Sequence, residues 1–146
     1  MTSPSIRSLS ELATGVYKAV AMISVRDVFA ALAWFESIGF TVINKFADEG
    51  VLNFGMVRFG NAEIMMRLDD EPSTGTRLWF YTEQIDELYA AFEKRQSENG
   101  SPGTPAIEFS ETINDTFYNA RQFGVCAPDG HTLYFIGNLG RRSQQP

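Results

Sequence analysis

Apolar and polar residues follow one another in two similar blocks along this chain. In the first block, apolar alternation predicts a strand at 17–25, and apolar residues at helical spacing predict a helix at 28–38. Asp27 is placed to cap this helix and Gly39 to end it. The strands that follow are expected at 40–46, 52–59 and 62–68.

The second block repeats this order. A strand is predicted at 77–82, and a helix with one apolar face at about 84–97. The remaining segments are expected to be a short strand at 106–109, a loop at 110–115 and a final hairpin with strands at 116–125 and 131–136. Each block thus consists of a strand, a helix and three strands, which predicts an α+β protein.

Related turns close the two blocks. Pro128-Asp129-Gly130 separates two strand-like runs, and Gly60-Asn61 separates a weaker pair in the first block. A chain that ends both halves with the same device is predicted to hold two copies of one βαβββ module, at 17–68 and 77–137. Because neither half could bury both faces of its own sheet, we expect the two modules to curl together into one domain.

The segments outside the two modules give less information about fold and function. Residues 1–16 are expected to form an arm or short helix that could pack on a neighbour, and residues 138–146 a tail. The first fifteen residues lack the long apolar core of a signal peptide, and no stretch approaches the length of a membrane span. Cys126 is the only cysteine, so no intrachain disulfide can form, and a reducing cytoplasm is the expected compartment.

The composition is that of a folded, acidic chain. A length of 146 residues with 44% hydrophobic residues is enough to form a core. The net charge of −6 disfavours nucleic acid as a partner, because phosphate binding requires clustered Lys and Arg. An acidic chain favours a cationic ligand, although many proteins are acidic simply for solubility.

Two groups of motifs resemble a known superfamily. In the first, Val25-Arg26-Asp27 precedes the first helix, which carries Trp34-Phe35, and Ile38-Gly39-Phe40 follows. The second runs from Arg121-Gln122-Phe123 to Ala127-Pro128-Asp129-Gly130-His131. Over residues 17–137 the chain resembles the vicinal oxygen chelate superfamily, which includes glyoxalase I, extradiol dioxygenases, fosfomycin-resistance thiol transferases and bleomycin resistance proteins. The second group is most similar to the bleomycin-resistance branch, although Ala127 stands where that branch usually carries Asp.

The resemblance implies that each module supplies half of a cup, curved from a mixed sheet, in which catalytic members hold a divalent metal with four side chains. Carried over to this chain, those positions are Val20, Met65, Arg77 and Tyr134. Valine has no donor atom, methionine sulfur is a weak ligand, arginine is a cation, and tyrosine would have to ionise from a pKa of about 10. We therefore expect no metal and no other cofactor. The only histidine, His131, points away from the face of Tyr134 by strand alternation and is expected to be structural.

Strand alternation assigns an aromatic and sulfur-rich set of side chains to the cup. The residues between them are aliphatic or Phe and are assigned to the helix-packed face, so a slip by one residue would invert the pattern. The candidate ligand-binding residues are Met22, Phe54, Met65, Arg67, Arg77, Trp79, Tyr81, Arg121, Phe123 and Tyr134. We interpret them as a stacking pocket for a flat or aromatic ligand, while the same side chains could instead fill a closed cup or a dimer seam.

Three of these candidates are arginines: Arg67, Arg77 and Arg121. If they are unpaired, they favour an anionic ligand; if they are paired with carboxylates, they are structural. The candidate carboxylate partners are Glu63, Asp69, Glu108 and Asp115. We find no acid–base or nucleophile arrangement on this face, and Cys126 is expected to be a small core residue.

The resemblance then favours binding over catalysis. It implies a metal-free small-molecule binding protein, similar to bleomycin resistance proteins, that sequesters an aromatic or glycopeptide-like ligand in a groove between the chains of a domain-swapped homodimer. One alternative is an enzyme of the superfamily with an atypical or absent metal site. Another is a structural or regulatory dimer whose cup is filled by its own side chains.

Overall fold

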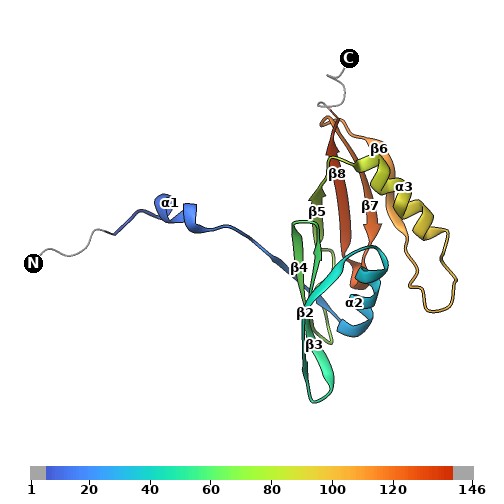
Figure 1. Cartoon of the computed structure of the whole chain (residues 1–146), viewed down its shortest axis with the longest axis horizontal. Coiled ribbons are helices and arrows are strands. Elements are labelled where there is room, and N and C mark those ends of the chain that lie inside the picture. Colours follow the sequence, from blue (N-terminus) through green and yellow to red (C-terminus); the bar gives the residue numbers. More distant parts are fainter. Residues whose placement is uncertain (1–5, 140–146) are drawn as a thin grey trace, which may run out of the picture.

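The two blocks form two βαβββ modules in the computed structural model, which describes residues 6–139 (Figure 1). The first module comprises β1 (Ala21–Val25), α2 (Val28–Ser37), β2 (Thr41–Asp48), β3 (Val51–Phe59) and β4 (Ala62–Leu68). The second comprises β5 (Arg77–Tyr81), α3 (Ile85–Gln96), β6 (Phe109–Asp115), β7 (Ala120–Cys126) and β8 (Thr132–Asn138). Residues 1–5 of the predicted arm and 140–146 of the predicted tail lie outside the described residues.

Each module forms its own four-stranded mixed sheet. The strand orders are β1-β4-β3-β2 and β5-β8-β7-β6, so equivalent strands occupy equivalent places. The β1–β4 and β5–β8 pairs are parallel, and the other neighbouring strands are antiparallel. The predicted α+β architecture of two repeated modules is confirmed.

Both helices cover the same side of the two sheets, as Figure 1 shows. One hydrophobic core lies between the helices and the sheets and contains buried residues of both modules. Aromatic rings join the modules within it: Phe40 lies 5.9 Å from Phe80, and Phe59 lies 5.9 Å from Phe135, between ring centroids. The opposite side of the two sheets carries no helix within residues 6–139, and we call it the open face.

The predicted helices agree closely with the structure. The Asp27 carboxylate caps α2 by accepting a hydrogen bond from the Ala30 N–H at 3.0 Å, as the sequence predicted. The helices also contact one another across the modules, because the Arg95 Nε–H of α3 donates to the Ser37 carbonyl at 2.9 Å. No helix between residues 6 and 139 has the length and apolar character to span a membrane.

A buried histidine ties the second module to the first. His131 is 1% exposed, and its Nε2 lies 2.9 Å from the Ser24 carbonyl oxygen while its Nδ1 accepts the Thr76 N–H at 3.3 Å. Nε2 is the ring nitrogen that donates here, because a carbonyl oxygen can only accept a hydrogen bond. Asp129, two residues before His131 and at a φ of 63°, accepts a hydrogen bond from the backbone N–H of Arg26 at 3.2 Å. The Pro-Asp-Gly-His run therefore joins the modules, and the structural role predicted for His131 is confirmed.

The bounds of the last elements differ from the prediction, and the strand expected at 106–109 begins only at Phe109. Residues 110–115, expected to be a loop, belong to β6, while residues 116–119, expected to begin the final hairpin, form the turn between β6 and β7. The β-branched and aromatic side chains of the turn resemble a strand in sequence. In the structure Asn119 takes a φ of 62°, which asparagine adopts more readily than most residues. At the other end, β1 begins at Ala21, four residues later than expected.

The described part of the N-terminal arm projects away from the modules (Figure 1). It contains α1 (Leu9–Leu12), whose N-terminus is closed by a capping box between Ser8 and Glu11. Its larger apolar side chains are exposed, and they are Ile6, Leu9, Leu12, Val16 and Tyr17. At its root Lys18 forms an ion pair with Glu63 of β4 at 2.5 Å.

Candidate functional site

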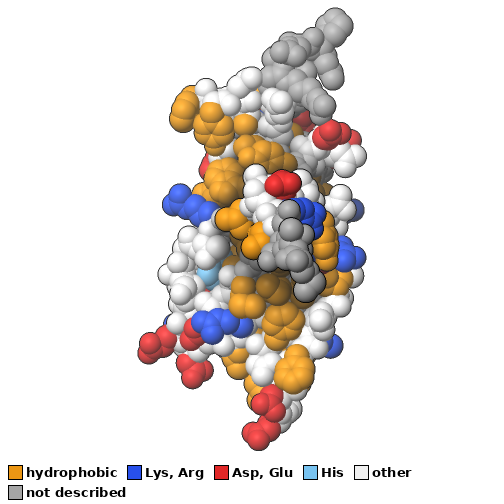
Figure 2. Space-filling view, turned by 90° about the vertical axis from the view of Figure 1, so that its left-hand side faces the viewer, with side chains coloured by type: hydrophobic (Ala, Val, Ile, Leu, Met, Phe, Trp, Pro, Cys, Tyr) orange, Lys and Arg blue, Asp and Glu red, His pale blue; other side chains and the backbone are white. Residues whose placement is uncertain are grey.

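The open face carries most of the side chains that the sequence assigned to the cup. In the first sheet, Ile23 and Met66 form a paired row in the core, so the next paired row, Met22 and Met65, lies on the open face. The same alternation places Phe54 and Arg67, which pair with one another, on this face. Hydrophobic side chains spread over the face in Figure 2.

An aromatic stack stands on the open face of the second sheet. Trp79 of β5 and Tyr134 of β8 pair in parallel register, with their ring centroids 4.3 Å apart and their planes 13° apart. Trp79 is 44% exposed, and its neighbour on the same face, Tyr81, is 83% exposed. Side chains that only filled the interior of this chain would be covered, so this stack offers apolar ring surface to a ligand or partner.

The next strand leaves room for the stack. Gly124 of β7 pairs with Tyr134, and a Cβ atom at position 124 would lie 3.1 Å from Cε1 of the Tyr134 ring. Ser110 Oγ occupies the same space from the other side. The glycine therefore permits Tyr134 to lean across β7, which sets the position of its ring.

Two predicted site residues, Arg121 and Phe123, lie on the opposite side of β7. Phe123 is fully buried, and its ring stacks on Phe135 in the core at 5.1 Å. The prediction that both face the cup is wrong because the hairpin pairs Cys126 with Thr132. That register puts the even-numbered residues of β7 on the same face as Tyr134 and turns the odd-numbered ones toward the helices.

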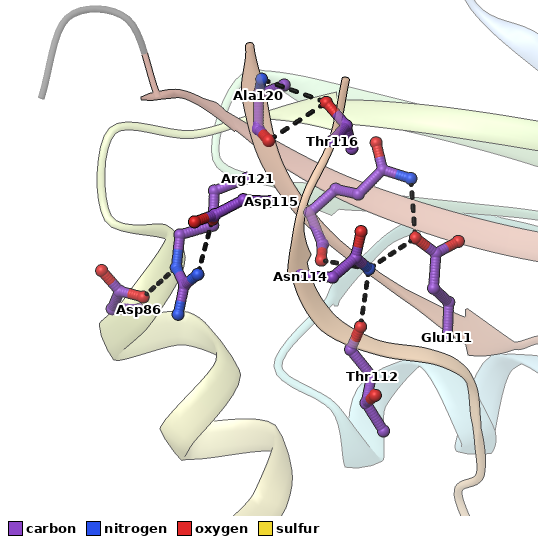
Figure 3. A network of polar contacts seen from close by, with 9 residues as sticks. Asp86, Glu111, Thr112, Asn114, Asp115, Thr116, Ala120 and Arg121 are labelled. Atoms are coloured by element: carbon purple, nitrogen blue, oxygen red, sulfur yellow. Dashed lines mark hydrogen bonds and ion pairs between the residues drawn. The ribbon is translucent and has the colours of Figure 1, made fainter. Parts of the chain in front are cut away.

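Arg121 is engaged on the helix side (Figure 3). Its Nε lies 2.7 Å from Asp86 Oδ1 of α3, and its Nη1 lies 2.6 Å from Asp115 Oδ1 of β6. Hydrogen bonding to Asp86, and then to Asp115, raises the pKa of Arg121 above its ordinary value. This arginine fixes α3 to the sheet and is removed from the set of candidate ligand-binding residues.

The other two arginines, Arg67 and Arg77, are on the open face and differ in whether a carboxylate pairs with them. Arg67 Nη2 pairs with Asp69 Oδ2 at 3.3 Å at the exposed end of β4. Arg77, two residues before Trp79 on β5, is exposed and has no hydrogen-bonding or ion-pair partner among residues 6–139. Within that part of the chain, a free cation therefore stands beside the aromatic stack.

Cys126 lies on the open face and is exposed, whereas the sequence predicted a small core residue. The reason is the same register of β7 that buries Phe123. The thiol is thus accessible in a single copy of the chain.

Sequence reasoning missed a carboxylate on this face. Glu111 of β6 pairs with Gly124, and its Oε1 accepts hydrogen bonds from Asn114 Nδ2 at 2.7 Å and Gln122 Nε2 at 2.9 Å (Figure 3). It was overlooked because residues 110–115 were expected to form a loop. The asparagine at position 119, a residue type favoured in left-handed turns, is the signal that could have placed the turn correctly.

The four positions of the superfamily's metal ligands do not suit a metal. Val20 precedes β1, Met65 pairs with Met22, and Arg77 pairs with Thr132. With Tyr134 these side chains offer one phenol oxygen, one thioether and a guanidinium cation, which do not make a divalent metal site. Within the described part of the chain, no three His, Cys, Asp or Glu side chains are grouped to hold a metal ion.

A small cavity lies beside the stack, between the root of the arm and the second module. Its volume is about 210 Å³, and its lining includes Lys18, Glu63, Leu78 and Trp79. Pockets for drug-sized ligands are about 300–1,000 Å³. Beside the stack, the described residues therefore form an aromatic surface with a small hollow next to it.

Comparison with protein families decides the classification. Residues 19–135 match the model of the glyoxalase/bleomycin resistance protein/dioxygenase superfamily. The chain belongs to this superfamily. The resemblance drawn from its motifs is thereby confirmed, and the arm before residue 19 lies outside the matched region.

Solved structures of the superfamily share the fold at low sequence identity. A bleomycin resistance determinant encoded on the transposon Tn5 and a bleomycin-binding protein complexed with bleomycin each superpose with a TM-score of 0.65 at 17% identity, over 84% of this chain and 98% and 99% of theirs, respectively. A glyoxalase-related enzyme from Clostridium phytofermentans gives a TM-score of 0.65 at 21% identity, over 84% of this chain and 95% of its own. No curated protein matches the chain. Identities this low establish the fold and leave the ligand open.

Proposed function

We propose that this protein is a metal-free binding protein that sequesters an aromatic small molecule on its open face without altering it. The observation that carries the proposal is the exposed stack of Trp79 on Tyr134. Stacked rings on an uncovered sheet bind a flat ligand through burial and ring contact. The structural neighbour that holds bleomycin supports this class of ligand.

Two copies of the chain complete the site in this proposal. Met22, Trp79 and Tyr81 are exposed in one copy, and apolar surface of this kind marks an interaction site. A homodimer that pairs open faces would cover these side chains and convert two shallow surfaces into grooves. The single cysteine of each chain, Cys126, is exposed, which suits a reducing cytoplasm.

Charges on the face would orient the ligand. Arg77 is on one side of the stack, and Glu111 is on the other side of Tyr134. Binding strength would come from the rings, and the charged groups would select the orientation.

The experiment is a titration of tryptophan fluorescence with bleomycin. The chain has two tryptophans, and Trp34 is buried in the core, so Trp79 should report binding. We expect saturable quenching that is absent in Trp79→Phe, and recovery of chemically unchanged bleomycin by mass spectrometry. A modified product would instead support the enzymatic alternative.

Calorimetry with two alanine variants tests whether the ligand binds at the stack or at other exposed aromatic side chains. Trp79→Ala should weaken binding more than tenfold, since burial of an aromatic side chain is worth about 1.5–3 kcal/mol. Phe117→Ala is the matched control, because Phe117 is 99% exposed in the turn between β6 and β7 and away from the stack. An unchanged affinity in Trp79→Ala would refute the assignment of the site.

A further inference from the structure

Four paired residues form one row across the second sheet. Trp79 pairs with Tyr134, Tyr134 with Gly124, and Gly124 with Glu111. Residues paired in this way point to the same face of a sheet, here the open face. Neighbouring strands are about 4.8 Å apart, so the backbones of Tyr134 and Glu111 are separated by about 10 Å.

A β-bulge aims Glu111 at this face. The register of β6 and β7 shifts between Phe109 and Glu111, so Ser110 and Glu111 both stand opposite Gly124. Bulges of this kind redirect a side chain and recur next to functional sites. Without the extra residue, the carboxylate would alternate to the helix-packed face.

Three neighbouring side chains hold the carboxylate in place. Asn114 and Gln122 both donate to Glu111 Oε1, and the Tyr118 hydroxyl donates in turn to Gln122 Oε1. Gln122 is 5% exposed, so this bracing is largely removed from solvent. The second oxygen, Oε2, has no partner among the described residues.

No cation neutralises Glu111 within residues 6–139. Its neighbour on β7, Arg121, is on the opposite side of the strand and is engaged by Asp86 and Asp115 (Figure 3). The amide donors that brace Glu111 carry no net charge. A half-buried, oriented carboxylate beside an aromatic surface is thus left to interact with a positive charge from outside the chain.

We propose that Glu111 binds the cationic group of a planar aromatic ligand whose ring lies on the Trp79–Tyr134 stack. This inference rests on the proposed function and specifies its ligand class as a flat aromatic cation. Arg77, the cation beside the stack, lies on β5, at the opposite edge of the sheet from Glu111 on β6. It would therefore face the uncharged or anionic end of a ligand whose cationic group lies at Glu111. The ring would supply the contact area, and the charge-assisted hydrogen bond to Oε2 would discriminate cations from anions of the same shape.

Two acridines of equal ring size test the charge preference. The probes are 9-aminoacridine, a cation at neutral pH, and acridine-9-carboxylate, an anion, with binding followed by acridine fluorescence anisotropy at physiological ionic strength. The native protein should bind the cation at least tenfold more tightly. Glu111→Gln, which keeps the shape of the side chain, should remove that preference.

Glu87→Gln is the matched control. Glu87 is exposed on α3, on the covered side of the sheet, and its loss changes the net charge by the same amount. The preference should survive in this variant. Its loss there, or its persistence in Glu111→Gln, would overturn the proposal.

The remaining outcomes separate this inference from the proposed function. If both acridines bind with equal affinity and Trp79→Ala weakens both, the role of Glu111 is refuted while the aromatic binding surface stands. If neither acridine binds but bleomycin does, the inference again fails alone. If bleomycin also fails to bind, both proposals fall.

Discussion

Tyr134 lies so close to Gly124 that a Cβ atom at position 124 would be 3.1 Å from the Tyr134 ring. The two residues pair across antiparallel strands, and the missing side chain of one determines where the ring of the other lies. The stack with Trp79 therefore depends on a residue that makes no ring contact itself.

Gly124→Ala should consequently push aside Ser110 Oγ, which would lie 2.4 Å from the new Cβ atom, and displace the Tyr134 ring, which loosens the stack. If bleomycin binds as proposed, its affinity should fall roughly two- to tenfold, because an aromatic pair is worth about 0.5–1.5 kcal/mol. Calorimetry measures the affinity, and near-ultraviolet circular dichroism reports the altered Trp79–Tyr134 geometry. Gly15→Ala is the control, since no atom lies within 4 Å of a Cβ there. Native affinity in Gly124→Ala would show that the glycine does not set the position of the ring.

Replacement of His131 should destabilise the junction between the modules. His131→Phe leaves the Ser24 carbonyl and the Thr76 N–H without their partner, and we expect a loss of about 2–4 kcal/mol in the free energy of unfolding. Urea unfolding measures this loss. Arg26→Ala, which removes only an exposed ion pair with Asp129 at 3.8 Å, should cost less than about 1 kcal/mol. Equal effects of the two variants would contradict the special role of the histidine.

The reactivity of the Cys126 thiol tests whether two copies of the chain pair through their open faces. The thiol is exposed on the open face of a single chain and would be covered if two open faces pair. Its reaction rate with Ellman's reagent should therefore fall as protein concentration rises through the dimer range seen by analytical ultracentrifugation. Cys126→Ser supplies the background. A rate independent of concentration in a demonstrated dimer would place the interface elsewhere.

The ion pair between Lys18 of the arm and Glu63 of β4 should be lost in acid. A hydrogen bond from Lys18, the largest cause, lowers the pKa of Glu63 below its ordinary value of 4.5. A lowered pKa means that the ion pair stabilises the fold above the unfolded-state pKa, and that this stabilisation is lost as the pH falls through the folded-state pKa. Lys18→Ala should therefore lower Tm slightly at neutral pH, and the difference from the native protein should vanish in strong acid. A difference that persists unchanged in acid would exclude the ion pair as its cause.

Alternation alone predicted the faces of the first and last strands of each module. In β1, β4, β5 and β8 one face is uniformly aliphatic or Phe, so the sequence was sufficient to assign Met22, Met65, Trp79 and Tyr134 to the open face. The period-2 signal is strong there because only one face of each strand is packed on the core.

The β6–β7 hairpin could not be predicted in the same way. Its outer strand is polar and contains two register irregularities, which erase a period of two and conceal Glu111. In β7, Phe123 looks like a ligand-binding aromatic in sequence, and only the pairing of Gly124 with Tyr134 shows that it belongs to the core. Register across a hairpin depends on the location of the turn, which local composition misplaced.

The aromatic contacts between the modules have a consequence for unfolding. Phe40 and Phe59 of the first module pack on Phe80 and Phe135 of the second, so neither half can bury its own rings alone. A fragment ending within residues 69–76 would expose these rings to water and should not persist as an autonomous unit. The chain should therefore unfold in one cooperative transition, although its sequence consists of two similar modules.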